Sequence, residues 1–559
     1  MAELLMGDEA VGLAAIDAGI RGAFSYPGTP ATEIFECIRS RAGEAVAARW
    51  SANEKIAYEE ALGMSYVGGR ALVSMKHVGL NVAADPFMSS ALTGTVGGLV
   101  CAVADDPGMH SSQNEQDTRF YADFARVPLF EPSNQQEAYD MTREAFELSE
   151  ELGIPVVIRL VTRLAHSRAA VERKPPSDRK PLDQRGDANN WILLPPNARR
   201  RNRRLIDMQD VFGRRSEESP HNEIVLRGGT GIIACGLGYN YVKEAIGDQS
   251  EFSILKISAY PVPTRLVREI VDHCNQIVVV EEGYPLIEAR LRGLLGVPSK
   301  TIRGRMDGAL PPDGELSANL VRRALGLHVA LPVGAIEDLP ARPPSLCQGC
   351  PHCDTFRMIN DALSPGVVPL LFGDIGCYTL GAMPPYNAVD TCVEMGASVG
   401  MALGAAKAGA HPILCTIGDS TFAHSGMGTI LAAAKENANM TVVILDNAGV
   451  AMTGGQDVFV TGEDFIRLLR GLGVDARHIV QIDPVKKDHA RNVELLREEI
   501  DYRGLSVVIA TRPCIHLKRR AHEEHSAVGC ASSSCVRPPQ PGVERIGPRR
   551  ETASQCRAQ

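Results

Sequence analysis

Short apolar runs rich in β-branched residues alternate with amphipathic stretches along most of this 559-residue chain. Residues 70–79 and 97–108 are two such runs, each bounded by glycine or proline. Runs of this length are typical of buried strands, and the stretches between them are long enough for helices. Strands that alternate with helices form parallel sheets covered on both faces, because each crossover returns the next strand in the same direction. The alternation therefore predicts an α/β fold.

The alternation falls into three blocks, and we expect a doubly wound parallel sheet in each. Between the first two blocks lies a polar segment rich in arginine and proline, which we interpret as a solvated linker or docking helix. The C-terminal tail has little apolar content and is expected to be disordered. The expected divisions are a first block at 1–165, a linker at 166–222, a central block at 223–335, a third block at 340–515 and a tail at 516–559.

Charge and composition exclude several classes of function. The net charge of −9 argues against nucleic acid as a partner, since phosphate backbones bind basic surfaces. Residues 1–12 carry early acidic groups and no long apolar core, which is unlike a signal peptide. The most apolar stretch, 92–104, is too short to span a membrane. We therefore expect a cytoplasmic protein, whose fourteen cysteines are free thiols or metal ligands.

Polar residues follow two consecutive strands of the third block. Gly418 and Asp419 come directly after one predicted strand, and Asn447 follows the next. Carboxyl ends of parallel strands meet at one edge of a sheet, where such sheets bind ligands. An Asp carboxylate, an Asn carbonyl and a nearby main-chain oxygen suit Mg²⁺ that holds a diphosphate. Taken alone, the same residues also fit an ordinary strand–helix–strand unit with polar turns.

Three cysteines recur at a spacing of three, at Cys347, Cys350 and Cys353. Such a run could bind zinc, bind an iron–sulfur cluster, exchange a disulfide or have no chemical role. The spacing alone does not choose among these.

The Gly418–Asn447 segment resembles the signature of thiamine diphosphate enzymes, in which GDG is followed by a helix, a strand and Asn. Ser420 replaces the last glycine of that signature. Four further stretches make the resemblance specific: "YPGTPATEI", "NEKIAYEEALGMSYVGGRALVSMKHVGLNVAADP", "HSSQNEQDTR" and "NAGVAMTGGQ". Together they resemble the large alpha subunit of the indolepyruvate ferredoxin oxidoreductases, in the same order from residue 1 to about 515.

The resemblance implies an activity and its partners. Members of that family oxidise arylpyruvates with coenzyme A and ferredoxin, giving aryl-acetyl-CoA, CO₂ and reduced ferredoxin. It also implies a small beta subunit, a heterotetramer of two alpha and two beta chains, and no nucleic-acid or membrane partner. The first block would be the pyrimidine-binding domain, the third the diphosphate-binding domain, and the central block a domain like the C-terminal domain of transketolase.

The resemblance also assigns site residues. Glu54, nine residues before Gly63, would activate the aminopyrimidine of thiamine, and the nearby Glu59 and Glu60 would be solvated. Thr29 would donate to the substrate carboxylate, with His77 and Asn81 lining the same pocket. The diphosphate and its Mg²⁺ would be held by Gly418, Asp419, Ser420, Asn447 and Gly449, of which Asp419, Asn447 and Gly449 would be the metal ligands.

By the same resemblance, one [4Fe–4S] cluster would be bound by Cys347, Cys350, Cys377 and Cys514. Cys353 stands where relatives have arginine and would be a spare thiol. Zinc could bind the same thiolates but would not carry electrons. The tail lacks the two C-x-x-C-x-x-C-x-x-x-C-P runs of a ferredoxin domain, and its cysteines, Cys530, Cys535 and Cys556, have other spacings.

Two alternatives belong to other functional classes. One is a non-oxidative 2-oxo acid decarboxylase, which would release an aldehyde and transfer no electrons. The other is a non-catalytic assembly subunit, which would not bind thiamine diphosphate. The joint presence of Glu54, Asp419 and Asn447 argues against the second alternative.

Overall fold

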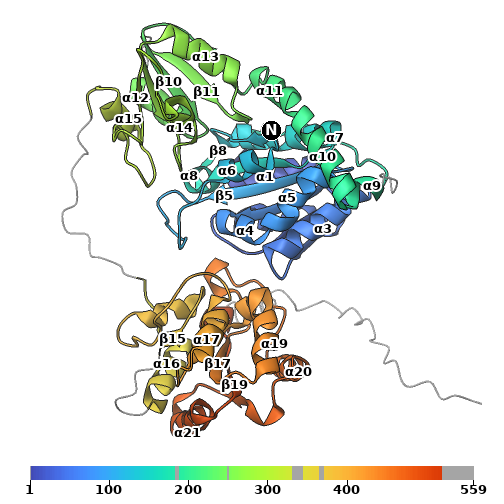
Figure 1. The fold of residues 1–559 in the computed structure, drawn as a ribbon, viewed down its shortest axis with the longest axis vertical. Coiled ribbons are helices and arrows are strands. Elements are labelled where there is room, and N and C mark those ends of the chain that lie inside the picture. The colour runs from blue at the N-terminus through green and yellow to red at the C-terminus, as the bar shows by residue number, and fades with distance from the viewer. Residues whose placement is uncertain (1, 183–187, 248–250, 330–343, 364–369, 519–559) are drawn as a thin grey trace, which may run out of the picture.

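The described residues form three α/β domains, each centred on one main sheet (Figure 1). The computed structural model describes residues 2–182, 188–247, 251–329, 344–363 and 370–518. Cys530, Cys535 and Cys556, and the expected disorder of the tail beyond residue 518, lie outside the described residues. Among the described helices, none combines the length and the apolar character that a membrane crossing requires.

The first domain contains a seven-stranded sheet whose central strands are buried on both faces. Its strands lie in the order β12 (Ala259–Tyr260), β6 (Leu129–Phe130), β7 (Val156–Val161), β5 (Leu99–Asp105), β4 (Ala71–Lys76), β2 (Gly22–Ser25) and β3 (Ala47–Trp50). One face packs against α1 (Gly7–Asp17), α2 (Thr32–Ala42) and α7 (Gln135–Leu152), and the other against α3 (Glu54–Tyr66) and α5 (Ala84–Thr93). Burial on both faces explains the continuous apolar runs of β4 and β5.

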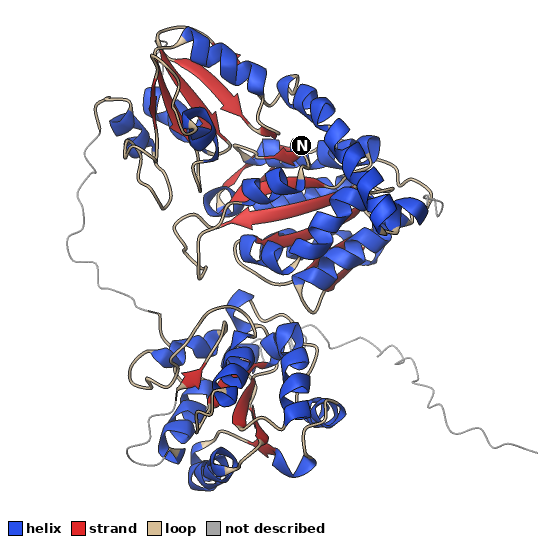
Figure 2. Ribbon diagram, viewed as in Figure 1, coloured by secondary structure: helices blue, strands red, loops and turns tan. Residues whose placement is uncertain are grey.

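The central domain has a five-stranded sheet. The order is β14 (Thr301–Arg303), β13 (Gln276–Val280), β10 (Thr230–Cys235), β11 (Ser253–Ile257) and β9 (Ile224–Val225). Helices flank these strands, as they do in the other two domains (Figure 2). The sheets of the first two domains are not purely parallel as expected, because β9 pairs antiparallel with β11, and β12 pairs antiparallel with β6 of the first domain. Both β9 and β12 are two-residue edge strands, which are too short to show a sequence pattern. A further antiparallel pair, β1 (Ala2–Met6) with β8 (Arg168–Glu172), forms a separate two-stranded sheet.

The third domain has a fully parallel five-stranded sheet. The order is β15 (Leu371–Phe372), β16 (Leu414–Gly418), β17 (Met440–Asp446), β19 (Leu505–Thr511) and β18 (Ile479–Ile482). One face packs against α17 (Ala397–Lys407), α19 (Met427–Glu436) and α20 (Glu463–Gly471), and the other against α16 (Pro351–Ala362) and α21 (His489–Asp501). The α/β fold with doubly wound sheets is thus confirmed, with β18 as a strand that the sequence pattern did not indicate.

The segment between the first two domains differs from a solvated linker. Its first part, β8 (Arg168–Glu172), pairs with β1 (Ala2–Met6), so the first domain extends beyond residue 165. Three helices follow among the described residues, α9 (Ala188–Trp191), α10 (Pro195–Asp207) and α11 (Gln209–Glu217). Arg201 of α10 is buried and donates to the carbonyl oxygens of Leu92 and Thr93, at 2.5 and 3.0 Å. The arginine-rich helix α10 is therefore docked on the first domain.

A buried network of charges joins the first two domains. Arg159 of β7 donates from Nε to Asp105 at 2.6 Å and from Nη2 to the carbonyl oxygen of Glu282 at 3.1 Å. Arg119 of α6 (Thr118–Ala125) donates from Nη1 to Glu281 at 2.9 Å. Both guanidinium groups are fully buried, and Glu281 and Glu282 follow β13 of the central domain. Charges taken out of water must be paired in this way, because an isolated buried charge is strongly destabilising.

The substitution Arg159→Leu tests the network. It leaves the buried Asp105 carboxylate without its cation, so we expect a loss of about 3–5 kcal/mol in the free energy of unfolding. Urea titration followed by circular dichroism measures this loss. Lys407→Met is the control, since Lys407 pairs with Glu436 at 3.0 Å on the exposed surface and should leave the midpoint unchanged. Equal midpoints for the two variants would contradict the assignment.

Candidate active site

A cavity of about 190 Å³ lies between the first and third domains, at the carboxyl ends of both sheets. Tyr26 follows β2, Lys76 ends β4, and Gly418 ends β16, so the two sheet edges face each other across the cavity. This is the edge at which open parallel sheets bind ligands. From the first domain the wall includes Tyr26, Gly28, Thr29, Glu54, Lys76 and Gln113, and from the third it includes Cys377, Gly418, Asp419, Ser420, Asn447 and Gly449.

Asp419 and Asn447 meet on the third-domain wall. The strands that precede them, β16 and β17, are neighbours in the sheet. The Asp419 carboxylate accepts from the backbone N–H of Ser420 at 2.6 Å and from that of Asn447 at 3.1 Å. Burial raises the pKa of Asp419 to about 7. A buried carboxylate beside an amide oxygen is a donor set that fits a hard divalent cation, which would also offset the cost of the buried charge.

Glu54 lies on the opposite wall and contacts the third domain. It is the first residue of α3, is 5% exposed, and its Oε2 lies 2.9 Å from Nε2 of His424. The N-cap residue Asn53 accepts from Ile56 N–H and donates to the main-chain oxygen of His424 at 2.9 Å. A Cβ at Gly79 would lie 2.6 Å from Glu54 Oε1, so only glycine leaves room for this carboxylate. The other acids of α3, Glu59 and Glu60, are exposed.

Two residues of this interface were not found from the sequence. His424 follows β16, and its ring packs edge-on against that of Tyr26, with centroids 4.9 Å apart. The Tyr26 hydroxyl forms a hydrogen bond of 2.7 Å with Ser420 Oγ, next to Asp419. Both contacts join the two walls of the cavity. No spacing rule indicates them, because each depends on how two separate domains meet.

Lys76 is a further cavity residue that the sequence analysis missed. It is 9% exposed, and its ammonium group donates to the carbonyl oxygen of Ser111 at 3.0 Å. Burial lowers its pKa to about 8, although the nearby Asp106 and Glu54 carboxylates act in the opposite direction. The cavity thus contains a cation that is suited to an anionic group of a ligand.

His77 and Asn81 do not line this cavity, contrary to the expectation from the sequence. His77 is buried, and its Nε2 lies 3.0 Å from the carbonyl oxygen of Asn114. Asn81 is exposed on α4 (His77–Val82), where its side-chain oxygen accepts from the Tyr121 hydroxyl. The reason is geometric, since the chain turns into α4 directly after Lys76 and carries both side chains away. Thr29 does line the cavity.

The four cysteines of the expected cluster come from three separate loops of the third domain. Cys350 is the N-cap residue of α16, and burial raises its pKa to about 12, with added repulsion from the thiols of Cys353, Cys377 and Cys347. Burial likewise raises the pKa of Cys377 to about 11, with contributions from Cys514 and Cys347. Cys377 therefore lies near Cys347, Cys350 and Cys514, and none of these four cysteines forms a disulfide.

Two of these cysteines connect to the cavity, whereas Cys353 lies beside Cys350 and does not line the cavity. Cys377 lies in the cavity wall, and the backbone N–H of Cys514 donates to the main-chain oxygen of Asn447 at 2.9 Å. The thiol of Cys353 points to the main-chain oxygen of Cys347, at 3.8 Å. Four converging thiols are a donor set that fits a cubane iron–sulfur cluster.

The residues on each side of the cavity lie in a region that matches a known protein family. Residues 13–197 match the family model described as "Pyruvate flavodoxin/ferredoxin oxidoreductase, thiamine diP-bdg". Residues 374–509 match the model described as "Thiamine pyrophosphate enzyme, C-terminal TPP binding domain". The two matched regions contain Glu54 and Asp419, which face each other across the cavity.

Curated relatives extend the similarity over nearly the whole chain. The indolepyruvate oxidoreductase subunit IorA of Archaeoglobus fulgidus is 38% identical over 94% of this chain and 88% of its own length. Its counterpart from Methanothermobacter thermautotrophicus is 38% identical over 91% of this chain and 86% of its own. The one from Pyrococcus abyssi is 36% identical over 91% and 85%. The chain therefore belongs to the family of indolepyruvate oxidoreductase IorA subunits, which are thiamine diphosphate-dependent 2-oxo acid:ferredoxin oxidoreductases.

Proposed function

We propose that this chain catalyses the oxidative decarboxylation of aryl 2-oxo acids, with coenzyme A and ferredoxin as co-substrates. The observation that carries the proposal is that Glu54 and the Asp419–Asn447 pair line opposite walls of one cavity. In this family Glu54 would act on the pyrimidine of thiamine, and the Asp419–Asn447 pair would act on its diphosphate. The products would be an aryl-acetyl-CoA, CO₂ and reduced ferredoxin.

The third-domain wall would hold the diphosphate end of the cofactor. Asp419, the side chain of Asn447 and the main-chain oxygen of Gly449 would bind Mg²⁺, with Gly418 and Ser420 beside the diphosphate. On the other wall, Glu54 would share a proton with the aminopyrimidine in place of its present partner His424. When bound, thiamine diphosphate supplies the electron sink that lets a 2-oxo acid lose CO₂. The closed interface would exclude water from this step.

The first-domain wall would bind the substrate. The Thr29 hydroxyl and the Lys76 ammonium group both line the cavity and are suited to the carboxylate of a 2-oxo acid. An aryl side chain needs apolar walls, because aromatic rings gain free energy by leaving water. The cavity provides them at Ile375, Met395, Val450 and Met452.

A [4Fe–4S] cluster on Cys347, Cys350, Cys377 and Cys514 would receive the electrons. Its position is supported by Cys377, which lies both in the cavity wall and among the four thiols. Ferredoxin would be the final acceptor, and coenzyme A would take up the acyl group. The cytoplasm, where thiols stay reduced, would be the matching compartment.

We also propose a small beta subunit as partner, in a heterotetramer of two alpha and two beta chains. An exposed apolar surface on the first two domains is a candidate contact. Phe124 of α6 is 79% exposed, and Leu294 and Leu295, which follow α14 (Leu286–Arg292), are fully exposed. The two helices are adjacent, since Arg290 and Asp123 form an ion pair of 2.5 Å. Apolar side chains exposed together are typical of interaction surfaces.

Substitution of Glu54 tests the role of the cofactor-activating acid. Glu54→Gln keeps the size of the side chain but removes its acid–base chemistry, so decarboxylation should fall about 10²–10⁴-fold. Thiamine diphosphate affinity, measured by calorimetry, should stay within a few-fold. Glu59→Gln changes an exposed acid of the same helix and should leave the rate of CO₂ release unaltered. Turnover of the two variants at similar rates would remove Glu54 from the mechanism.

The iron content tests the proposed oxidative reaction. Protein purified anaerobically should be brown, with about four irons per chain in the described site. Cys350→Ala should lose most of this iron, whereas Cys353→Ala should keep most of it, because Cys353 is not one of the four expected ligands. Iron analysis and arylpyruvate-dependent ferredoxin reduction measure the two effects.

Three results, from this experiment and from the cofactor-binding measurement, would contradict the proposal. A colourless protein with stoichiometric zinc would overturn the cluster assignment. Aldehyde release without ferredoxin reduction, from protein that contains its iron, would favour the non-oxidative decarboxylase. Failure to bind thiamine diphosphate at all would favour the non-catalytic subunit.

The pH dependence tests Lys76. Because burial lowers its pKa to about 8, the ammonium charge is complete well below pH 8 and is lost as the pH rises through that value. We therefore expect kcat/KM for the arylpyruvate to fall above pH 8, since kcat/KM reports groups of the free enzyme. Lys76→Met should lower kcat/KM and abolish this alkaline fall, whereas the exposed Lys55→Met should change neither. An unchanged alkaline fall in Lys76→Met would assign it to another group.

A further inference from the structure

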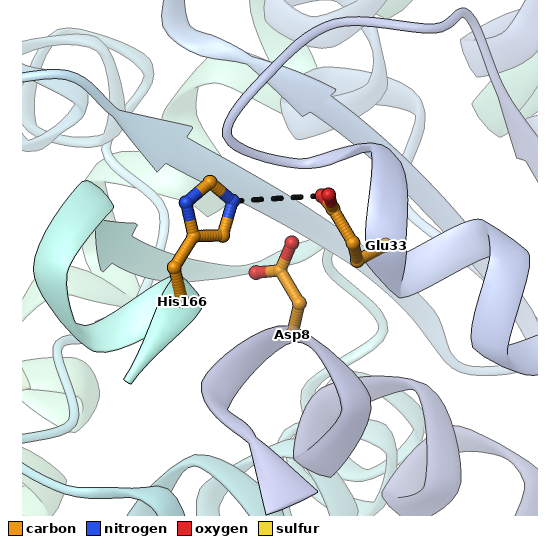
Figure 3. A group of neighbouring side chains, drawn as sticks. All are labelled: Asp8, Glu33 and His166. Atoms are coloured by element: carbon orange, nitrogen blue, oxygen red, sulfur yellow. Dashed lines mark ion pairs between the residues drawn. The ribbon is translucent and has the colours of Figure 1, made fainter. Parts of the chain in front are cut away.

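Three side chains that can bind a metal converge on the first domain, outside the cavity. Asp8, Glu33 and His166 each offer one ligand atom, and these atoms all lie within 4.8 Å of one another. They come from separate elements, α1, α2 and α8 (Thr162–His166). Figure 3 shows the Asp8 carboxylate directed towards the space between the Glu33 carboxylate and the His166 ring. The cluster is thus assembled by the fold rather than by a local motif.

Asp8 is the unusual member of this cluster. Its side chain is fully buried, and within the described part of the chain neither carboxylate oxygen has a hydrogen-bond partner. No described lysine or arginine forms an ion pair with it, and the charged groups that act on it, Glu33 and Glu9, are themselves acidic. A charged carboxylate buried without a partner is strongly unfavourable, and a bound cation would offset that cost.

Glu33 and His166 leave the opposite side of the cluster open. His166 Nε2 and Glu33 Oε2 lie 3.6 Å apart, and the two side chains are 36% and 34% exposed. One of the Glu33 oxygens is buried without a hydrogen bond among the described residues. The cluster therefore has a closed, charged floor at Asp8 and a side through which an ion and its waters could enter.

We propose that Asp8, Glu33 and His166 form a binding site for a divalent transition-metal ion. Two carboxylate oxygens and one imidazole nitrogen suit Mn²⁺, Fe²⁺ or Zn²⁺, whereas Mg²⁺ and Ca²⁺ favour oxygen ligands alone. The ion would supply the positive charge that Asp8 lacks. Water molecules would fill its remaining positions on the exposed side.

Such an ion would tie together three helices beside the substrate-binding loop. Glu33 is the second residue of α2, and the residues that lead into α2 include Gly28 and Thr29, which line the cavity. An ion bound at Glu33 would thus hold the start of α2 against α1 and α8. This role is structural, and it does not depend on the reaction proposed above.

Mn²⁺ is a suitable probe, because it binds oxygen and nitrogen ligands and avoids the cysteine thiols. The experiment uses the full chain with the Asp419→Ala substitution, which removes the expected diphosphate-metal site. Bound Mn²⁺ is measured as loss of the free-ion electron paramagnetic resonance signal. We expect one Mn²⁺ per chain, and electron spin echo modulation should show coupling to an imidazole nitrogen.

Two variants and a control decide the outcome. Asp8→Asn should abolish the bound Mn²⁺, and the partly exposed His166→Gln should abolish the nitrogen coupling. Asp361→Asn is the control, because Asp361 faces His489 at 2.8 Å but has no third ligand among the described groups, and it should retain both signals. Absence of Mn²⁺ binding, or binding that is unaltered in Asp8→Asn, would overturn the site. Asp8 would then be a buried, protonated acid.

Discussion

The contact between Glu54 and His424 is the constraint on which the architecture of the site depends. It spans two domains, because Glu54 begins a helix of the first and His424 follows a strand of the third. Neither domain alone lines the whole cavity, since Glu54 belongs to the first domain and the Asp419–Asn447 pair to the third. Every other feature of the cavity follows from bringing these two carboxyl edges face to face.

The sequence predicts those parts of the fold and site that depend on local order along the chain. The strand ends at Gly418 and Asn447 could be placed together, because neighbouring parallel strands bring their carboxyl ends to one edge. Likewise the buried strands β4 and β5 are visible as continuous apolar runs. Glu54 and Thr29 came instead from the resemblance to a family, because their spacing alone assigns no chemistry.

Other site residues and the short edge strands could not be predicted from the sequence, and the physical reason differs from one to the next. Tyr26 and His424 act through contacts between domains, which leave no periodic trace in the sequence. Lys76 and His77 are consecutive, yet only the first lines the cavity, because the backbone enters α4 between them. Edge strands of two residues, such as β12, are too short to show a pattern, although β12 joins two domains in one sheet.

Several ionisable side chains in and near the cavity are buried, and burial makes their charged forms unfavourable. Burial raises the pKa of Asp419 to about 7 and lowers that of Lys76 to about 8, so each group is shifted towards its neutral form. Burial also raises the pKa of Asp374 to about 7; Asp374 does not line the cavity but precedes Ile375, which does. Asp374 is supported by hydrogen bonds from Tyr378 and Ser398. Groups shifted in this way mark a region arranged for binding rather than for stability. The charges of a bound metal and substrate would reverse the shifts.

The shared sheet and the buried arginines make the first two domains one mechanical body, and the cavity lies where that body meets the third domain. A cofactor that contacts both bodies stabilises their association. Its measured affinity then contains two contributions, the contacts themselves and the work of bringing the bodies together. A protein that binds both bodies and stabilises their association would raise the affinity for the cofactor without contacting it. By thermodynamic reciprocity, the cofactor would raise the affinity for that protein by the same factor.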